Sequence, residues 1–133
     1  MKIYLASFLE PDNFGKGRLF SIASNNKFPS YLKLTGKFSK LAPSIEIMNN
    51  YIYKKYENKD EAASSFRNEF SNQLDSYLNE INDYCLNNNC NINDVLSLCD
   101  NDTLLSWERK GNPNYRDLVA EFLKKINYEV VLN

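Results

Sequence analysis

The stretch DTLLSWERKGNPNYRDLVAEFLKKINYEVVLN (Asp102–Asn133) decides the fold. It begins with a short apolar run, Thr103–Trp107, which is too short for a helix and predicts a buried strand. A polar segment that we call the elbow, Glu108–Asn112, separates this strand from a helical pattern, and a closing strand is predicted over Tyr128–Leu132. Strand, elbow, helix and strand form a βαβ unit, which implies parallel strands joined by a right-handed crossover.

The helix of this unit has clear signals at its start. Asn112 can cap it, Pro113 suits the first helical position, and Asn114 is the alternative cap. Apolar side chains then recur at helical spacing and predict one buried stripe. The stripe consists of Tyr115, Leu118, Val119, Phe122, Leu123 and Ile126.

Two further strands are predicted near the N-terminus, Lys2–Phe8 and Arg18–Ala23, because both are rich in β-favouring residues. These two strands either form a hairpin or lie apart in the sheet. The basic glycine segment Gly15–Arg18 lies between them and lacks the spacing of a phosphate-binding P-loop. The long irregular connection Ser24–Pro43 is a candidate lid over the strand ends.

Helical periodicity dominates the middle of the chain. Ser44 is expected to cap a first helix, and the longest pattern runs from Glu61 to about Leu86. The aromatic stripe of that long helix is more typical of a core than of a ligand site. A short helix is expected over Ile92–Leu98. The resulting order predicts a three-layer α/β sandwich around a small, largely parallel sheet.

Length and composition indicate a single globular domain over residues 1–133. The formal net charge of -1 argues against a broad face that binds nucleic-acid polymers. No stretch approaches the length of a membrane span, and the N-terminus does not resemble a signal peptide. The expected location is therefore the cytoplasm.

The chain contains three cysteines and no histidine. Cys85, Cys90 and Cys99 lack paired metal-ligand spacing, so we expect buried free thiols, no metal and no cofactor. The lack of histidine removes the commonest general base and the usual partner of a nucleophilic Ser or Cys. Carboxylate, amine and phenol groups remain available for catalysis.

We expect the functional site at the elbow, because ligands of parallel sheets bind beyond the carboxyl ends of the strands, near helix N-termini that attract anions. The elbow region carries the cations Arg109, Lys110 and Arg116 and the amides Asn112 and Asn114. Guanidinium groups suit phosphates, and amide side chains can contact ribose or base.

Arg18 lies beside another predicted strand end, so it is a further candidate phosphate ligand. For the elbow, the alternative is that Arg109 and Arg116 form surface ion pairs with Glu108 and Asp117.

Several segments resemble the domain of unknown function 488 family. That family shows a strand similar to LLCWEK, followed by a Cys-His-Arg segment that opens a helix similar to HLVAEWL. The matching segments here are LLSWERK (104–110), YRDLVAE (115–121), KIYLASF (2–8), LFSIA (19–23) and LAPS (41–44). The resemblance spans most of the chain and implies a small α/β sandwich.

This chain departs from the family pattern where the chemistry would lie. The family's Cys-His pair falls on Asn114 and Tyr115, and the Cys before the Trp-Glu segment is Ser106. Only Arg116 of the Cys-His-Arg trio is kept. The missing thiol and imidazole favour a binding protein over an enzyme.

A second, weaker resemblance is to the phage anti-Thoeris sponge proteins, and it is carried by chain size, the N-terminal segment and Arg109. Proteins of that group are small, cytoplasmic and oligomeric, and they bind a glycocyclic ADP-ribose signal without cleaving it. The resemblance implies a viral counter-defence protein in an infected bacterial host, assembled as a dimer or hexamer.

The leading hypothesis is therefore a non-enzymatic protein that sequesters a nucleotide-type signal similar to cyclic ADP-ribose. Phe8, Phe28 or Trp107 would stack on its base. One alternative is a hydrolase or transferase acting on a phosphorylated small molecule, with Glu108 as general base and Arg109 as charge stabiliser. The other alternative is a protein-interacting adaptor that uses the long helix.

Overall fold

The structure of the chain is a computed structural model that describes residues 1–107 and 114–132. Arg109, Lys110 and Asn112, which the sequence places in the site, lie outside the described residues together with Glu108 and Pro113. The strands are β1 (Lys2–Ser7), β2 (Leu19–Ser21), β3 (Gly36–Lys37), β4 (Thr103–Ser106) and β5 (Glu129–Leu132). The α-helices are α1 (Ile45–Tyr53), α2 (Lys59–Asn88), α3 (Ile92–Leu96) and α4 (Arg116–Lys125), and the short 3-10 turns are η1 (Pro11–Asn13) and η2 (Ser39–Leu41).

The five strands form one sheet in the order β3-β2-β4-β1-β5, and every pair of neighbours is parallel. β4 lies between β1 and β2, so the two N-terminal strands lie apart and form no hairpin. β4, α4 and β5 form the C-terminal βαβ unit, with β1 between its two strands. The predicted α/β sandwich around a small parallel sheet is confirmed.

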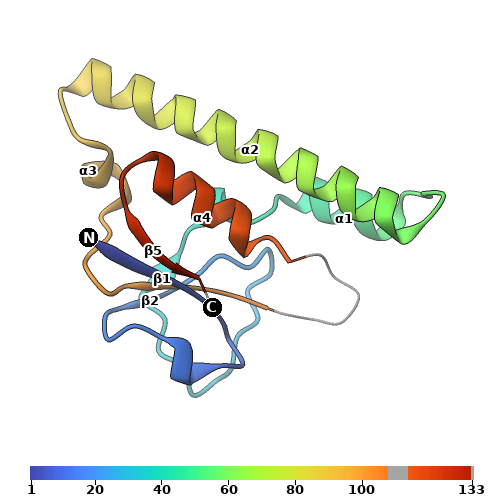
Figure 1. Cartoon of the computed structure of the whole chain (residues 1–133), viewed down its shortest axis with the longest axis horizontal. Helices are drawn as coiled ribbons and strands as arrows, with labels where there is room; N and C mark the ends of the chain where they lie inside the picture. Colours follow the sequence, from blue (N-terminus) through green and yellow to red (C-terminus); the bar gives the residue numbers. More distant parts are fainter. Residues whose placement is uncertain (108–113, 133) are drawn as a thin grey trace.

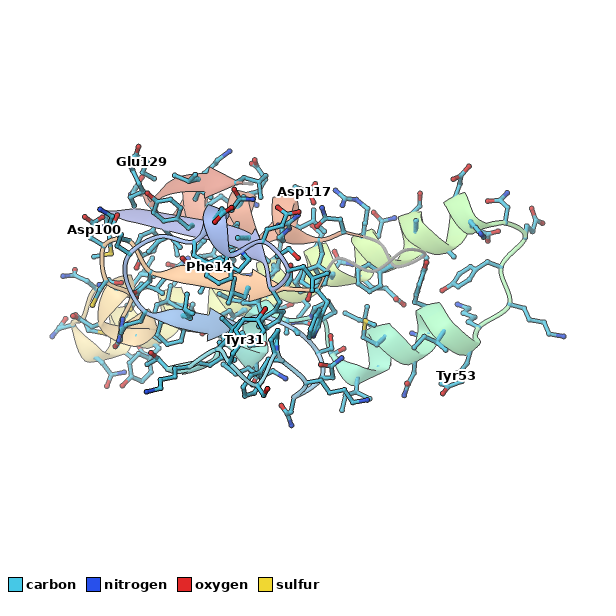
Figure 2. All side chains as sticks on the ribbon, turned by 90° about the horizontal axis from the view of Figure 1, so that it is seen from below. Phe14, Tyr31, Tyr53, Asp100, Asp117 and Glu129 are labelled. Carbon is cyan, nitrogen blue, oxygen red and sulfur yellow. The ribbon has the colours of Figure 1, made fainter. Side chains whose placement is uncertain are left out.

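The helices cover one face of the sheet, and loops cover the other. α4 packs on β1 and β5, and α2 lies across α4 on the side away from the strands (Figure 1). α1 packs beside α2, and the two run past the end of the sheet with Tyr53 near their tip (Figure 2). The loops that carry Phe14 and Tyr31 lie on the opposite face in the same view.

Alternation along the strands divides the apolar side chains between two cores. Ile3, Leu5 and Leu104 are fully buried in the core that the helices cover. Phe8 and Leu105 point the other way, into a smaller core beneath the loops. The smaller core is completed by Ala6 and Ala23, with Phe14, Leu19, Leu32, Leu34 and Trp107 packed against it.

The helices begin where capping side chains satisfy free backbone N–H groups. Ser44 Oγ accepts a hydrogen bond from the N–H of Ile47 at 3.2 Å, and Asn58 Oδ1 accepts from the N–H of Glu61 at 2.8 Å. The stripe of α2 is core, as expected, because its buried members face α1 and α4. These members are Phe66, Phe70, Leu74 and Ile81.

The basic glycine segment has a structural role at the amino edge of the sheet. The N–H of Gly17 donates to the carbonyl of Asn101 at 3.0 Å, just before β4. A Cβ atom on Gly17 would lie 2.8 Å from the carbonyl carbon of Asn101. Glycine is therefore needed here because two backbone segments approach each other closely.

Two expectations need correction. Cys85 and Cys90 are free but half-buried, and Cys99 is exposed, so none of the three thiols is fully buried. The connection Ser24–Pro43 is also more ordered than expected, because it contains β3 and η2. Among the described residues, no helix is both long and apolar enough to cross a membrane.

Candidate functional site

The carboxyl ends of β1 and β4 form the topological switch point of the sheet. The connection from β1 to β2 crosses β4 on the face that the loops cover. The connection from β4 to β5 crosses β1 on the opposite face, which the helices cover. Ser7 and Ser106 lie opposite each other at these two strand ends. Ligands of open parallel sheets bind in the crevice that such diverging connections leave.

Arg116 brings a cation to this edge as the first residue of α4. The side chain is buried, and the N–H of Arg116 donates to Asn114 Oδ1 at 3.0 Å. Burial lowers the pKa of Arg116, and the negative charge of Glu10, which follows β1, partly opposes that effect. The group nevertheless keeps its charge at neutral pH, because an arginine pKa lies far above 7.

Two of the three predicted aromatic residues contact each other here. The rings of Phe8 and Trp107 have centroids 4.8 Å apart, and Phe8 is fully buried. The indole N–H of Trp107 donates to the carbonyl of Lys27 at 2.9 Å, which ties β4 to the loop that carries Phe28. Phe8 thus supports Trp107 from the core, and Phe28, which is 44% exposed, has the most accessible ring of the three.

A pocket of about 270 Å³ opens beyond the carboxyl ends of β2 and β3. Its cation is Lys37, whose Nζ donates to the carbonyls of Ser24 at 3.3 Å and Asn25 at 3.4 Å and to Asn26 Oδ1 at 3.4 Å. The pocket is lined by Ser21, Asn25, Asn26, Phe28, Leu34, Gly36 and Lys37.

Of these lining residues, only Phe28 is predicted from the sequence. Lys37 was missed because β3 has only two residues, too few to show alternation.

The structure does not bring Arg18 together with Arg116. Arg18 precedes β2 at the amino edge, where its Nη2 forms an ion pair with Asp102 Oδ2 at 2.7 Å. Burial tends to raise the pKa of Asp102, but the hydrogen bonds from Arg18 and from the N–H of Cys99 outweigh burial and lower it. Arg18 is therefore held in an ion pair with a buried carboxylate, away from the proposed phosphate ligands. Asp117 likewise pairs with Arg67, at 2.6 Å, rather than with Arg116.

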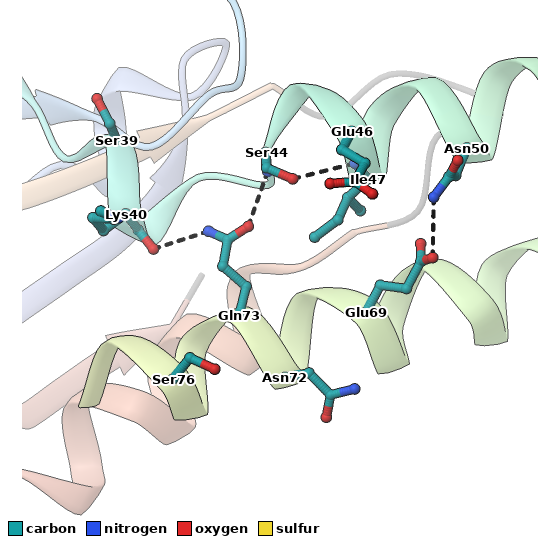
Figure 3. A pocket seen from close by; sticks show the side chains of 10 residues that line it. All are labelled: Ser39, Lys40, Ser44, Glu46, Ile47, Asn50, Glu69, Asn72, Gln73 and Ser76. Carbon is teal, nitrogen blue, oxygen red and sulfur yellow. Dashed lines mark hydrogen bonds between the residues drawn. The ribbon is translucent and has the colours of Figure 1, made fainter. Parts of the chain in front are cut away.

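A larger groove, of about 480 Å³, lies between η2, α1 and α2. Its polar groups mainly join the helices (Figure 3). The Gln73 amide donates to the carbonyl of Lys40 at 3.0 Å and accepts from the N–H of Ser44 at 3.0 Å, and Asn50 Nδ2 donates to Glu69 Oε1 at 3.1 Å. This groove lies away from the strand ends, and we do not assign the function to it.

Comparison with family models, with curated proteins and with solved structures finds no match to this chain. Within residues 1–107 and 114–132, no three His, Cys, Asp or Glu side chains gather as they would around a metal ion. The candidate site therefore rests on geometry alone: the switch point, the Lys37 pocket and the tryptophan that connects them.

Proposed function

We propose that this protein binds an anionic, nucleotide-type small molecule at the carboxyl edge of its sheet and leaves it chemically intact. The resemblances narrow the ligand to a signal similar to cyclic ADP-ribose, which the protein would sequester as a viral counter-defence. The observation that carries the proposal is the Lys37 pocket, which combines a cation, two amides and an accessible aromatic ring at the strand ends.

Each type of side chain in the pocket suits one part of a nucleotide. The three acceptors of Lys37 Nζ in the described part of the chain are uncharged oxygens. The positive charge is therefore not neutralised by them, and a phosphate would replace one of these long contacts. Asn25 and Asn26 can exchange hydrogen bonds with ribose or base edges. The half-exposed ring of Phe28 offers a face on which a base can stack.

The size of the pocket suits one part of such a ligand. Typical small-molecule sites have volumes of roughly 300–1,000 Å³, and this pocket is slightly smaller, at about 270 Å³. The rest of a dinucleotide would extend over β4, past Trp107, toward the switch point and Arg116. β4 is the immediate neighbour of β2, so this path follows adjacent strand ends.

The available groups support binding over turnover. The chain has no imidazole to activate a nucleophile. The hydroxyl oxygens of Ser7 and Ser21, at the ends of β1 and β2, accept hydrogen bonds from the N–H groups of Leu9 and Ala23, both at 3.1 Å. These serines therefore stabilise the turns after their strands. The adaptor hypothesis loses support because Phe66 and Phe70 of the α2 stripe are buried.

The test is calorimetric titration with cyclic ADP-ribose, ADP-ribose, AMP and inorganic pyrophosphate, followed by heat release and mass spectrometry of the ligand. We expect one of the adenine ligands to bind and to be recovered unaltered. Phe28→Ala should weaken that binding by about 5- to 150-fold, because base stacking on an aromatic ring contributes about 1–3 kcal/mol. Lys37→Gln should weaken binding of the phosphate-bearing ligands.

The control is Lys40→Ala, which removes another exposed lysine, from the groove between η2 and α2. It should leave the dissociation constant unchanged. Equal losses for Lys37→Gln and Lys40→Ala would show that only net charge matters and would refute the assigned pocket. Recovery of a cleaved ligand would refute simple sequestration.

A further inference from the structure

Two cysteines meet where α2 ends. Asn89, the residue after α2, adopts a left-handed conformation (φ 50°, ψ 45°) that turns the chain back on the helix. The carbonyl of Cys85 then accepts hydrogen bonds from the N–H groups of Asn89 and Cys90, the latter at 3.2 Å. This cap places the Cys90 and Cys85 sulfur atoms 3.4 Å apart, within hydrogen-bond reach of each other.

The pair is accessible from solvent. Both cysteines are only half-buried, and Cys90 lines a pocket of about 410 Å³ at the amino edge of the sheet. Asn91, Asn93 and Tyr128 also line this pocket, so part of its wall is polar. Cys90, which lines the pocket, is therefore the member of the pair that a small disulfide compound would meet there.

We propose that Cys85 and Cys90 form a thiol–disulfide exchange site that reacts with low-molecular-weight disulfides of the glutathione class and closes an internal disulfide. The site lies at the amino edge, away from the Lys37 pocket, so the inference is independent of the proposed function.

The exchange balances in two steps. The Cys90 thiol loses its proton, and its thiolate attacks one sulfur of the external disulfide, forming a mixed disulfide and releasing one small thiolate, which takes up a proton. Cys85 then loses its proton, and its thiolate attacks the Cys90 sulfur of the mixed disulfide. This step forms the Cys85–Cys90 bond and releases the second small thiolate, which takes up a proton. The two protein thiols are oxidised, and one external disulfide is reduced to two thiols.

The environments of the two cysteines indicate which one attacks the external disulfide first. Burial, the neighbouring Cys90 thiol and the negative charge of Asp94 raise the pKa of Cys85, which keeps Cys85 protonated and a poor first nucleophile. Cys90 lines the pocket and Cys85 does not, so we assign the first attack to Cys90. Cys85 already contacts the Cys90 sulfur, so its attack on the mixed disulfide is intramolecular and has a high effective concentration.

The test treats native protein with oxidised glutathione, blocks the remaining thiols with a maleimide and measures the intact mass. The Cys99→Ser variant should lose two hydrogens and carry neither maleimide nor glutathione, and a reducing agent should reverse the change. The matched control is Cys85→Ser, which also keeps two cysteines, Cys90 and Cys99, but no contacting pair. It should carry glutathione and form no internal disulfide.

A second measurement tests whether the disulfide forms because the fold holds the two sulfurs together or only because the cysteines are close in sequence. In the Cys99→Ser variant, the internal disulfide should form about 10-fold faster in native protein than in urea, because the helix cap holds the two sulfurs together. Circular dichroism of each variant confirms that α2 is intact. Stable mixed disulfides on native Cys99→Ser, or equal rates in buffer and urea, would overturn the proposal.

Discussion

Removing the carboxylate of Asp102 should destabilise the protein strongly, because this one side chain holds the amino edge of the sheet together. The side chain is 1% exposed and precedes β4. It accepts from the backbone N–H groups of Arg18 at 2.9 Å and Cys99 at 2.8 Å, as well as from the Arg18 guanidinium. Asp102→Ala leaves both backbone donors without this acceptor in a part-buried setting.

A buried N–H group that loses its acceptor costs about 1–3 kcal/mol of the free energy of unfolding. The two N–H groups are partly exposed to water, so we expect a total of about 2–4 kcal/mol. For a domain of this size, that cost lowers Tm by about 7–14 °C. Calorimetry or thermal circular dichroism measures the shift. The control is Asp83→Ala, which removes an exposed carboxylate from α2 and should change stability by less than about 0.5 kcal/mol. If both variants melt within about 2 °C of the wild type, the assigned role of Asp102 is wrong.

The same residue predicts how stability depends on acid. The folded protein lowers the pKa of Asp102 below its ordinary value of 3.8. A lowered pKa contributes stability that is present above the unfolded value and is lost as the pH falls through the folded one. The wild type should therefore lose stability below about pH 4, and Asp102→Asn should show a shallower loss over that range in urea titrations.

Three further substitutions test other contacts. Gly17→Ala should lower Tm because its new Cβ would lie 2.8 Å from backbone, whereas Gly36→Ala, whose Cβ would lie 3.7 Å from a ring, should be nearly neutral in the same thermal melt. Tyr115→Phe removes the donor to the buried carbonyl of Ile22, 2.7 Å away, and should cost about 1–3 kcal/mol in urea unfolding. Burial raises the pKa of Tyr128 to about 12, so its contribution to stability should be full below about pH 10 and lost as the pH rises through 12. An absorbance titration should show one phenol that ionises at a higher pH than an ordinary tyrosine, and Tyr128→Phe should remove this ionisation.

Local signals predicted most of the elements, because the physics behind them is local. The apolar runs mark β1 and β4, and the capping side chain of Ser44 marks the start of α1. α2 begins at Lys59, two residues before the predicted Glu61, because Asn58 caps it. The stripe of α4 is also found as expected, although the helix begins at Arg116, with Tyr115 in the cap position. Asn114 instead accepts from the N–H of Arg116.

Local sequence signals could not predict contacts between residues that are far apart in the sequence. The partner of Arg18 lies 84 residues away, so its sequence neighbours could not show that its charge is neutralised. Lys37 became a site residue only when β3 was placed beside β2. Cys85 and Cys90 meet through the left-handed residue Asn89, a cap that composition does not reveal.

The order of the strands also bears on how the chain folds as it is synthesised. β1 pairs with β4 and β5, whose residues follow it by roughly a hundred positions. A growing chain therefore carries its first apolar strand unpaired until the last elements have left the ribosome. We expect ribosome-bound fragments that stop before Thr103 to retain chaperones at their N-terminal segment and to acquire protease resistance abruptly once residue 132 is exposed.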